Sequence, residues 1–333
     1  MILRPYLLFL GDAKTEWVAK TAFGVRDWLP GESVGQLRLP GCGVDLGLAD
    51  LTPEAAVARG ARSMLIGVAP VGGEIPPSWT PSLLAALEAG LDLVSGLHTR
   101  LSDITEIGQA AERLGRTLHD VRHTDRKFPI ATGAKRNGNR LLTVGTDCAL
   151  GKKYTALAIA RALKARGLEA DFRATGQTGI MIAGEGVAID AVVADFVAGA
   201  AETLSPDAAA DHWDVIEGQG SLFHPAYAGV ALGLIHGSQP DAMVLCHDPS
   251  RLTLHSHTAY PLVGLDVAIR RFTEAASLTN PAAQVVGLSL NTSHLEPDRA
   301  QAIIDALEAE HGLPCFDPLR SSLEPLIDRL VSL

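Results

Sequence analysis

A glycine-rich segment that ends in two lysines has the residue types and spacing to bind phosphate. Residues 141–155 read LLTVGTDCALGKKYT, in which an apolar strand pattern leads into Gly145, and Gly151, Lys152 and Lys153 open a helical pattern. A strand, a glycine loop and a Gly-Lys pair before a helix direct backbone N–H groups, a helix N-terminus and an ammonium at one point. The segment therefore predicts a site for a phosphorylated ligand, with Lys152 as the phosphate lysine.

The residue after Lys152 separates this loop from the usual nucleotide-binding loop. The usual pattern, G-x-x-x-x-G-K-[ST], has a hydroxyl there that holds Mg²⁺, whereas this chain has Lys153 and a glycine spacing that is longer by one residue. Lys153 is either a solvated residue at the helix start or a second cation for phosphate. Thr155 could supply a displaced hydroxyl, and Asp147 either contacts a ligand or metal or caps the loop. The pattern indicates phosphate binding more strongly than ATP hydrolysis.

Two further polar clusters follow predicted strands. Residues 217–221, EGQGS, follow the strand pattern 213–216, and an acid at the carboxyl end of a buried strand lies where open α/β sheets bind ligands. Glu217 could hold a metal, act as a base or be a solvated acid in a turn. Arg173 precedes the segment 175–179, and a buried arginine there would pair either with an anionic ligand or with a carboxylate of the fold.

Six of the eleven histidines lie between residues 212 and 257. His224, just after the acidic turn, is a candidate general base, although loop histidines are also commonly polar surface residues. His255 and His257 on an extended segment would point to one side as a metal pair, but a third ligand is not evident, so no metal site is predicted. Cys148 is either a thiol activated at a helix N-terminus or, as we favour, a packing residue under the loop.

The elements that must position these residues alternate between strands and helices. Strand patterns cover residues 6–10, 63–68, 91–95, 140–144, 170–174, 213–216, 242–246 and 285–290. Helical patterns cover residues 15–23, 81–89, 104–114, 154–164, 189–203 and 300–311. This alternation predicts an α/β protein with parallel sheets. The polar, basic stretch 123–140 predicts a boundary between an N-terminal Rossmann-like domain, residues 1–130, and a second α/β domain, residues 138–333.

Composition limits the class of protein and its partners. The 333 residues suit two domains, and 47% hydrophobic residues provide ample core. No apolar run reaches the roughly 18 residues of a membrane span, and a formal charge of −10 argues against a nucleic-acid surface. Four scattered cysteines without a CxxC pair indicate a reducing compartment. We therefore expect a cytoplasmic protein without nucleic-acid or membrane partners, and a homo-oligomer.

Several segments resemble the dethiobiotin synthetase superfamily. GTDCALGK resembles its phosphate loop, G-T-D-T-x-x-G-K-T, and residues 173–179 and 217–220 resemble its second-strand and acidic-strand motifs. Leu290-Asn291 followed by Leu313-Pro314 resembles its base-recognition segment. The resemblance implies a P-loop NTPase-like fold for the second domain. It also implies an alternative function, an ATP- and Mg²⁺-dependent ligase or carboxylase in which Thr155 and Asp147 restore the metal site.

A further resemblance covers nearly the whole chain. GTDCALGKKYTA, ATGQTGIMIAGEGVAIDAVVADFVAGAAE, EGQGSLFHPAYAGVALGLIHGSQPD and GLPCFDPLR together resemble the D-glutamate N-acetyltransferase family, which has a P-loop fold. The resemblance implies an acyltransferase of D-amino-acid catabolism that moves the acetyl group of acetyl-CoA to the amine of D-glutamate. Acetyl-CoA would be the cosubstrate, and the two small molecules would be the partners of the chain.

The implied reaction assigns roles to the motifs. CoA carries a pyrophosphate and a 3′-phosphate, which a glycine loop with two lysines can hold without Mg²⁺. Glu217 or His224 would be the catalytic base, and a backbone N–H near Gly220 or Ser221 would stabilise the oxyanion. The residues expected at acetyl-CoA are Gly145, Thr146, Asp147, Cys148, Ala149, Leu150, Gly151, Lys152, Lys153, Tyr154, Thr155 and Asn291. The residues expected at the amino-acid substrate are Arg173, Gln177, Thr178 and Ser221. The turn 67–73 of the N-terminal domain could complete the site or only turn the chain.

Overall fold

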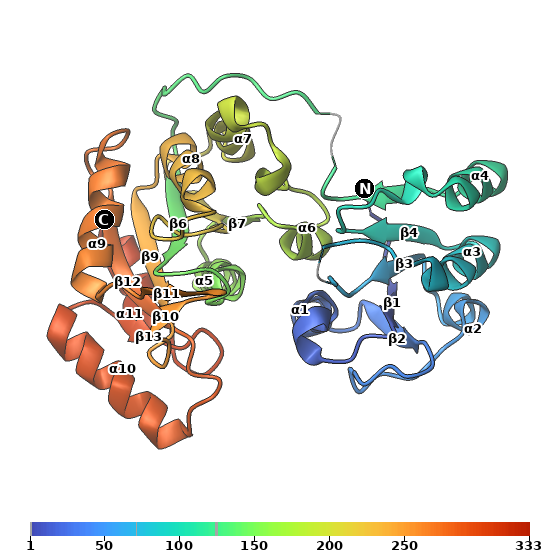
Figure 1. The fold of residues 1–333 in the computed structure, drawn as a ribbon. Coiled ribbons are helices and arrows are strands. Elements are labelled where there is room, and N and C mark those ends of the chain that lie inside the picture. Colours follow the sequence, from blue (N-terminus) through green and yellow to red (C-terminus); the bar gives the residue numbers. More distant parts are fainter. Residues whose placement is uncertain (1, 71, 124–125) are drawn as a thin grey trace. The chain divides into compact units, whose positions relative to one another are not determined.

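The chain folds into two compact units, which a computed structural model describes at residues 2–70, 72–123 and 126–333 (Figure 1). Unit 1 comprises Met1–Arg126 and Gln177–Ala188, and unit 2 comprises Lys127–Gly176 and Ile189–Leu333. Val71 of the turn 67–73 and residues 124–125 of the predicted boundary stretch lie outside the described residues. Among the described helices, none has both the length and the apolar character that a membrane span needs.

Unit 1 is built on a parallel sheet with the strand order β2-β1-β3-β4-β5. Its strands are β1 (Tyr6–Gly11), β2 (Ser33–Arg38), β3 (Ser63–Ile66), β4 (Asp92–Ser95) and β5 (Leu118–Asp120). All six residues of β1 are buried, as expected for a central strand that is covered by helices on both faces. The predicted parallel α/β architecture of the N-terminal half is confirmed.

Most helices of unit 1 connect these strands, and one comes from a later part of the chain. They are η1 (Glu16–Ala19), α1 (Lys20–Trp28), α2 (Pro53–Ala58), η2 (Pro77–Trp79), α3 (Thr80–Glu88), η3 (Leu101–Asp103), α4 (Thr105–Leu114) and α6 (Gln177–Ala183). Local chemistry sets several of their ends. Thr52 caps α2 by accepting a hydrogen bond from the N–H of Ala55, and Pro53 follows at the first helical position. Gly115, in the left-handed region with φ 62°, ends α4.

Helix α6 belongs to unit 1 although it follows a strand of unit 2 in the chain. The Thr178 hydroxyl lies 2.9 Å from the Thr21 hydroxyl of α1, and the Tyr6 hydroxyl donates to the carbonyl of Met181 at 3.2 Å. Contacts in space rather than order in the chain decide to which unit a segment belongs. The compact units therefore differ from the predicted domains, 1–130 and 138–333, at residues 177–188.

Unit 2 is built on a parallel sheet with the order β13-β12-β9-β6-β8-β7. Its strands are β6 (Asn139–Gly145), β7 (Ala170–Arg173), β8 (Trp213–Ile216), β9 (Ala242–His247), β12 (Gln284–Leu290) and β13 (Cys315–Phe316). A separate antiparallel hairpin consists of β10 (Thr253–Leu254) and β11 (His257–Pro261). Because the strands of the sheet are parallel, the turns after β6, β8 and β9 meet at one edge of the sheet.

Helices cover both faces of this sheet (Figure 1). The helices of unit 2 are α5 (Lys152–Ala165), η4 (Ile189–Ala191), η5 (Ala194–Phe196), α7 (Val197–Leu204), α8 (Ala228–Ser238), α9 (Leu265–Ser277), α10 (Pro297–His311) and α11 (Glu324–Val331). Of these, α5 and α11 pack on one face of the sheet, and α8, α9 and α10 pack on the other. Along β6, Leu141 packs with α5 and α11, whereas Leu142 packs with α9, since successive side chains of a strand face opposite ways. The single helix predicted over 189–203 is wrong: Val193 is extended, with ψ 136°, and two 3-10 turns precede α7.

Candidate active site

The predicted phosphate loop, residues 146–151, joins β6 to α5 at the carboxyl edge of the unit 2 sheet. Ala149 and Gly151 lie in the left-handed region, with φ 53° and 96°, and these two residues turn the chain into the helix. The N–H of Thr146 donates to the carbonyl of Cys246 at 3.1 Å, and its hydroxyl lies 3.0 Å from Nδ1 of His247. The loop is therefore held on the neighbouring strand β9.

Lys152 is the first residue of α5, and its ammonium lies in the hollow of the loop. Its side chain donates to the carbonyl of Asp147 at 2.8 Å, and the residue is 7% exposed. A Cβ on Gly145 would lie 3.3 Å from the ammonium nitrogen, so the glycine leaves the space that the lysine uses. Burial lowers the pKa of Lys152. A buried ammonium that donates to a neutral carbonyl is stabilised by a bound anion, as a phosphate lysine requires.

Asp147 caps the loop. One carboxylate oxygen accepts from the N–H of Cys148 at 2.6 Å, and the other accepts from the guanidinium of Arg251 at 2.8 Å and the N–H of His255 at 2.7 Å. Both oxygens are thus bonded within the fold. Of the two roles predicted for this residue, the contacts correspond to the cap.

Arg251 holds the loop in place and was not predicted. Its guanidinium contacts the Asp147 carboxylate and donates to the carbonyls of Cys148 at 2.7 Å and Ala149 at 3.3 Å. Arg251 also precedes the β10–β11 hairpin, so it fastens that segment to the loop. Its local sequence has no motif, and its partner Asp147 lies 104 residues away in the chain, so sequence patterns had no means to signal this role.

The hydroxyl of Thr155 points into the core. It lies 2.7 Å from the Ser289 hydroxyl and donates to the carbonyl of Gly151 at 3.2 Å, and the side chain is fully buried. The prediction that Thr155 replaces the missing magnesium hydroxyl is therefore wrong, because one turn of helix places residue 155 against β12. Lys153 instead lies near Glu217, where its charge lowers the pKa of that carboxyl. Of the two alternatives for Lys153, a solvated residue at the helix start or a second cation for phosphate, the second stays a prediction.

Glu217 is a buried acid at the carboxyl end of β8, with 3% exposure. One carboxylate oxygen accepts from the N–H groups of Thr175 at 3.0 Å and Gly176 at 3.1 Å. Burial raises the pKa of Glu217 to about 7, against the opposing effects of Lys153 and the two backbone donors. A carboxyl group with a pKa near neutral can both take and release a proton, which is what a general base needs.

The turn after β8 lies against strand β6 because Gly218 has no side chain. Its N–H donates to the Thr143 hydroxyl at 2.9 Å, and a Cβ would lie 1.6 Å from the carbonyl oxygen of Thr143. Next to it, the Gln219 amide donates to the Thr175 hydroxyl at 3.2 Å. The acidic turn is thereby fixed to both neighbouring strands.

His224 lies beside residues 147–148 of the phosphate loop. The imidazole is 2% exposed, and its Nδ1 accepts from the N–H of Ala226 at 3.2 Å. Its ring stacks on Tyr227, with centroids 4.6 Å apart, and packs edge-on against His257 at 4.7 Å. His257 is thus a packing partner of His224.

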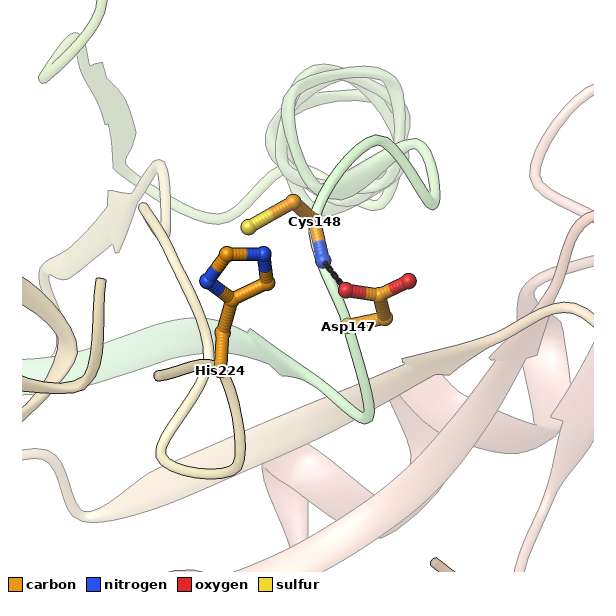
Figure 2. Close-up of side chains that lie close together, drawn as sticks. All are labelled: Asp147, Cys148 and His224. Carbon is orange, nitrogen blue, oxygen red and sulfur yellow. Dashed lines mark hydrogen bonds between the residues drawn. The ribbon is translucent and has the colours of Figure 1, made fainter. Parts of the chain in front are cut away.

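Figure 2 shows the imidazole of His224 beside the thiol of Cys148 and the carboxylate of Asp147. One potential ligand atom of each residue lies within 4.8 Å of the others, so the fold gathers three predicted site residues. These residue types also bind metals, but the Arg251 cation on Asp147 makes this position unfavourable for another cation. Burial raises the pKa of Cys148, which keeps it a thiol and agrees with packing under the loop.

Arg173 pairs within the fold. Its guanidinium donates to Asp214 at 2.6 Å and lies 3.2 Å from Asp171. Two carboxylates therefore satisfy the charge that was predicted to bind the substrate. This was one of the two alternatives for an arginine at this position, and the cross-strand pairing of Asp171 with Asp214 accounts for it.

The remaining predicted residues are dispersed. The buried Ser221 hydroxyl accepts from the N–H of Phe223 at 3.3 Å, and the Asn291 side chain accepts from the Ser293 hydroxyl at 2.8 Å; both close local turns in unit 2. Gln177 and Thr178 open α6 and are described with unit 1. The structure thus gathers the loop, Glu217 and His224 in unit 2.

Comparison with known proteins places the chain in a family. Residues 129–327 match the P-loop domain of unknown function DUF1611_C, and residues 37–124 match the Rossmann-like domain DUF1611_N. The chain is 50% identical over 332 residues to a D-glutamate N-acetyltransferase of Tritonibacter scottomollicae, with 100% of both chains covered. It is 46% identical to one of a Pseudoalteromonas species, with 98% of each covered. The chain belongs to the D-glutamate N-acetyltransferase family.

The family fold agrees with that of a solved relative. A crystal structure of a DUF1611 family protein from Anabaena variabilis ATCC 29413 is 34% identical, covers 99% of this chain and 100% of its own, and superposes with a TM-score of 0.88. The predicted order of a Rossmann-like domain and a P-loop domain is therefore confirmed. The loop, Glu217 and His224 lie within the matched P-loop domain of the family.

Proposed function

We propose that this chain transfers the acetyl group of acetyl-CoA to the amine of D-glutamate. The transferase activity and D-glutamate as the acceptor are supported by the full-length sequence identity with two D-glutamate N-acetyltransferases. Acetyl-CoA as the donor is our inference from the phosphate loop. The buried Lys152 ammonium, with Lys153 near it, suits the phosphates of CoA, and a loop without the magnesium hydroxyl suits phosphate binding without hydrolysis.

Glu217 is the base that we assign to the amine. Its carboxylate takes a proton from the ammonium of D-glutamate, and the free amine nitrogen attacks the thioester carbonyl carbon. The new C–N bond forms as the C–S bond breaks, and the CoA thiolate leaves and takes a second proton from the nitrogen. The proton on Glu217 then returns to solvent. A pKa of about 7 makes the carboxylate available near neutral pH.

His224 is better placed as a hydrogen-bond donor than as the base. Because its Nδ1 accepts from the N–H of Ala226, the neutral ring carries its proton on Nε2. Tyr227 and His257 hold the ring by packing. We assign to this N–H a hydrogen bond to the departing thiolate, which takes its proton from the nitrogen, and the role of base stays with Glu217.

The first test measures thiol release with D-glutamate and acetyl-CoA. We expect release with D-glutamate, and far less with L-glutamate. A protein that releases no thiol with acetyl-CoA, but hydrolyses ATP with Mg²⁺, would refute the proposal in favour of the ligase alternative.

Comparison of two donors tests the role of the loop. S-acetylpantetheine has the same thioester as acetyl-CoA but no phosphate or adenine. Lys152→Ala should lower kcat/KM for acetyl-CoA by roughly 10- to 100-fold, since a hydrogen bond to a charged group contributes about 1.5–3 kcal/mol. It should leave kcat/KM for S-acetylpantetheine unchanged.

Lys164→Ala is the matched control, because Lys164 is an exposed lysine of the same helix α5. It should use both donors as the wild type does. An equal loss with both donors in Lys152→Ala would mean that the lysine supports the fold or the chemistry rather than the CoA phosphates. The predicted homo-oligomer and cytoplasmic location belong to this proposal and follow from composition.

A further inference from the structure

Unit 1 contains a cavity of about 320 Å³ that the acetyl-transfer proposal does not use. Its walls are Asp12, Ala13, Lys14, Thr15, Val18, Val68, Pro70, Pro76 and Trp79, all of them residues of unit 1. Asp12 to Thr15 follow β1, and Val68 and Pro70 follow β3. The cavity therefore lies outside the carboxyl ends of these two neighbouring strands.

The strand order makes this position a binding crevice. In the order β2-β1-β3-β4-β5, the chain leaves β1 toward one edge of the sheet and returns to β3 on the other side of β1 (Figure 1). The connections after β1 and β3 diverge, and open α/β sheets bind ligands where such connections part. The cavity thus has the place of a ligand site within its own sheet.

The turn after β1 is built to hold an ionised carboxylate at the cavity. Gly11, with φ 52°, ends β1, and a Cβ there would lie 2.7 Å from the ring of Trp79. The glycine therefore admits Trp79, which is 2% exposed and packs edge-on against Phe9 at 5.3 Å. Its indole N–H donates to the Asp12 carboxylate at 3.0 Å, and this hydrogen bond lowers the pKa of Asp12.

Lys14, two residues after Asp12, supplies an ammonium group. The ammonium of Lys14 donates to the carbonyl of Gly41 at 2.8 Å, and the N–H of Gly43 donates to the carbonyl of Ala13 at 2.8 Å. The segment 41–43 therefore holds both Lys14 and Ala13 in place. In the part of the chain that the structure describes, Asp12 and Lys14 form no ion pair with each other. Both side chains are exposed, and although the charge of Lys14 contributes to lowering the pKa of Asp12, each can still meet a group of opposite charge on a ligand.

The size and lining of the cavity select the class of ligand. A volume near 320 Å³ is at the lower end for small-molecule sites, too small for a dinucleotide or CoA. The turn GDAKTEW lacks the glycine fingerprint of dinucleotide sites, and the Asp12 charge repels phosphate. The walls made by Val18, Val68 and Trp79 suit an apolar stem.

We propose that this cavity binds a free amino acid, with its ammonium at Asp12 and a carboxylate at Lys14. The inference is drawn from the charges, the apolar walls and the place of the cavity in unit 1. It does not depend on acetyl transfer by the chain, although an amino-acid acceptor would be a natural ligand. The sequence motifs assigned no role to Asp12, Lys14 or Trp79.

Binding of two probes to the full-length protein without acetyl-CoA tests the proposal. D-glutamate and glutarate share both carboxylates and the carbon chain, but glutarate lacks the ammonium. By calorimetry, the wild type should bind D-glutamate at least about tenfold more tightly than glutarate, as a hydrogen bond between charged groups implies. Asp12→Asn should remove this preference, because asparagine can still accept from Trp79 but has no charge.

Three further variants make the outcome specific. Lys14→Met should weaken the binding of both D-glutamate and glutarate, and it gives an independent test if Asp12→Asn does not fold. Asp103→Asn, at an exposed aspartate of unit 1 outside the cavity, should bind both as the wild type does. Lys152→Ala should weaken acetyl-CoA binding by roughly 10- to 100-fold and leave D-glutamate binding unchanged, so that a failure of the acetyl-transfer proposal can be distinguished from a failure of this one. The inference is overturned if the wild type binds neither probe, or if Asp12→Asn retains the preference for D-glutamate.

Discussion

Among single residues, Glu217 and Lys153 form a pair whose charges act on each other. Glu217 is buried and accepts from two backbone N–H groups, and burial raises its pKa to about 7 while Lys153 lowers it. A base must be ionised to act, so the reaction should depend on the protonation of this carboxyl. The dependence gives a test that reports on the pair rather than on either residue alone.

We expect kcat/KM to fall tenfold per pH unit below about pH 7 and to reach a plateau above it, because protonation of Glu217 removes the base. Lys153→Met should move this limb to higher pH, since loss of the nearby cation raises the pKa of the carboxyl further. Glu217→Gln should remove the limb and lower the plateau by roughly 10²- to 10⁴-fold. Rate profiles from pH 5 to pH 9, an interval of about two units on each side of this pKa, provide the measurement. A limb that stays in place in both variants would assign the titration to another group.

Among the elements, the contact of β6 with the turn after β8 depends on Gly218. A Cβ there would lie 1.6 Å from the carbonyl oxygen of Thr143, a backbone atom that cannot turn aside as a flexible side chain can. The same turn carries Glu217, so the spacing between the phosphate loop and the base depends on this glycine.

Gly218→Ala should destabilise the protein by about 3 kcal/mol or more, because the added methyl must displace buried backbone. Gly229→Ala is the matched control: within the described residues a Cβ at Gly229 in α8 meets no atom within 4 Å, and alanine in a helix should stabilise by up to about 1 kcal/mol. Urea unfolding midpoints would measure both. Equal midpoints for the two variants would show that Gly218 and the carbonyl of Thr143 lie farther apart in solution than in this structure.

Sequence patterns predicted the elements that carry strong local signals. The phosphate loop, β6, β8 and α5 were found because an apolar strand, glycines and a lysine lie together in the chain. The β10–β11 hairpin was missed because β11 is mostly exposed and has no alternation of apolar residues. Helix α8, nearly uniform in apolar and small residues, also lacks a helical stripe. The roles of Arg251 and Thr155 depend on partners 104 and 134 residues away, which no local pattern encodes.

In the whole molecule, the chain passes from unit 2 into unit 1 and back through residues 177–188. Helix α6 is held to α1 by the contact between the Thr178 and Thr21 hydroxyls, which is buried. Arg4 also donates to the carbonyl of Ile182. These contacts imply that α6 should open and close with unit 1, although its neighbours in the chain belong to unit 2.

Hydrogen exchange of residues 177–188 tests this assignment. Thr21→Val leaves the buried Thr178 hydroxyl without its partner, at a cost of about 1–3 kcal/mol, so exchange in α6 should become roughly tenfold faster or more. Adding Thr178→Val replaces both hydroxyls by methyl groups of similar shape and should restore most of the protection. Thr203→Val removes a comparable helix hydroxyl from α7 of unit 2 and should leave exchange in α6 unchanged. If exchange in α6 instead becomes faster in Thr203→Val and stays unchanged in Thr21→Val, the stability of α6 comes from unit 2. The boundary between the units would then lie at residue 127 alone.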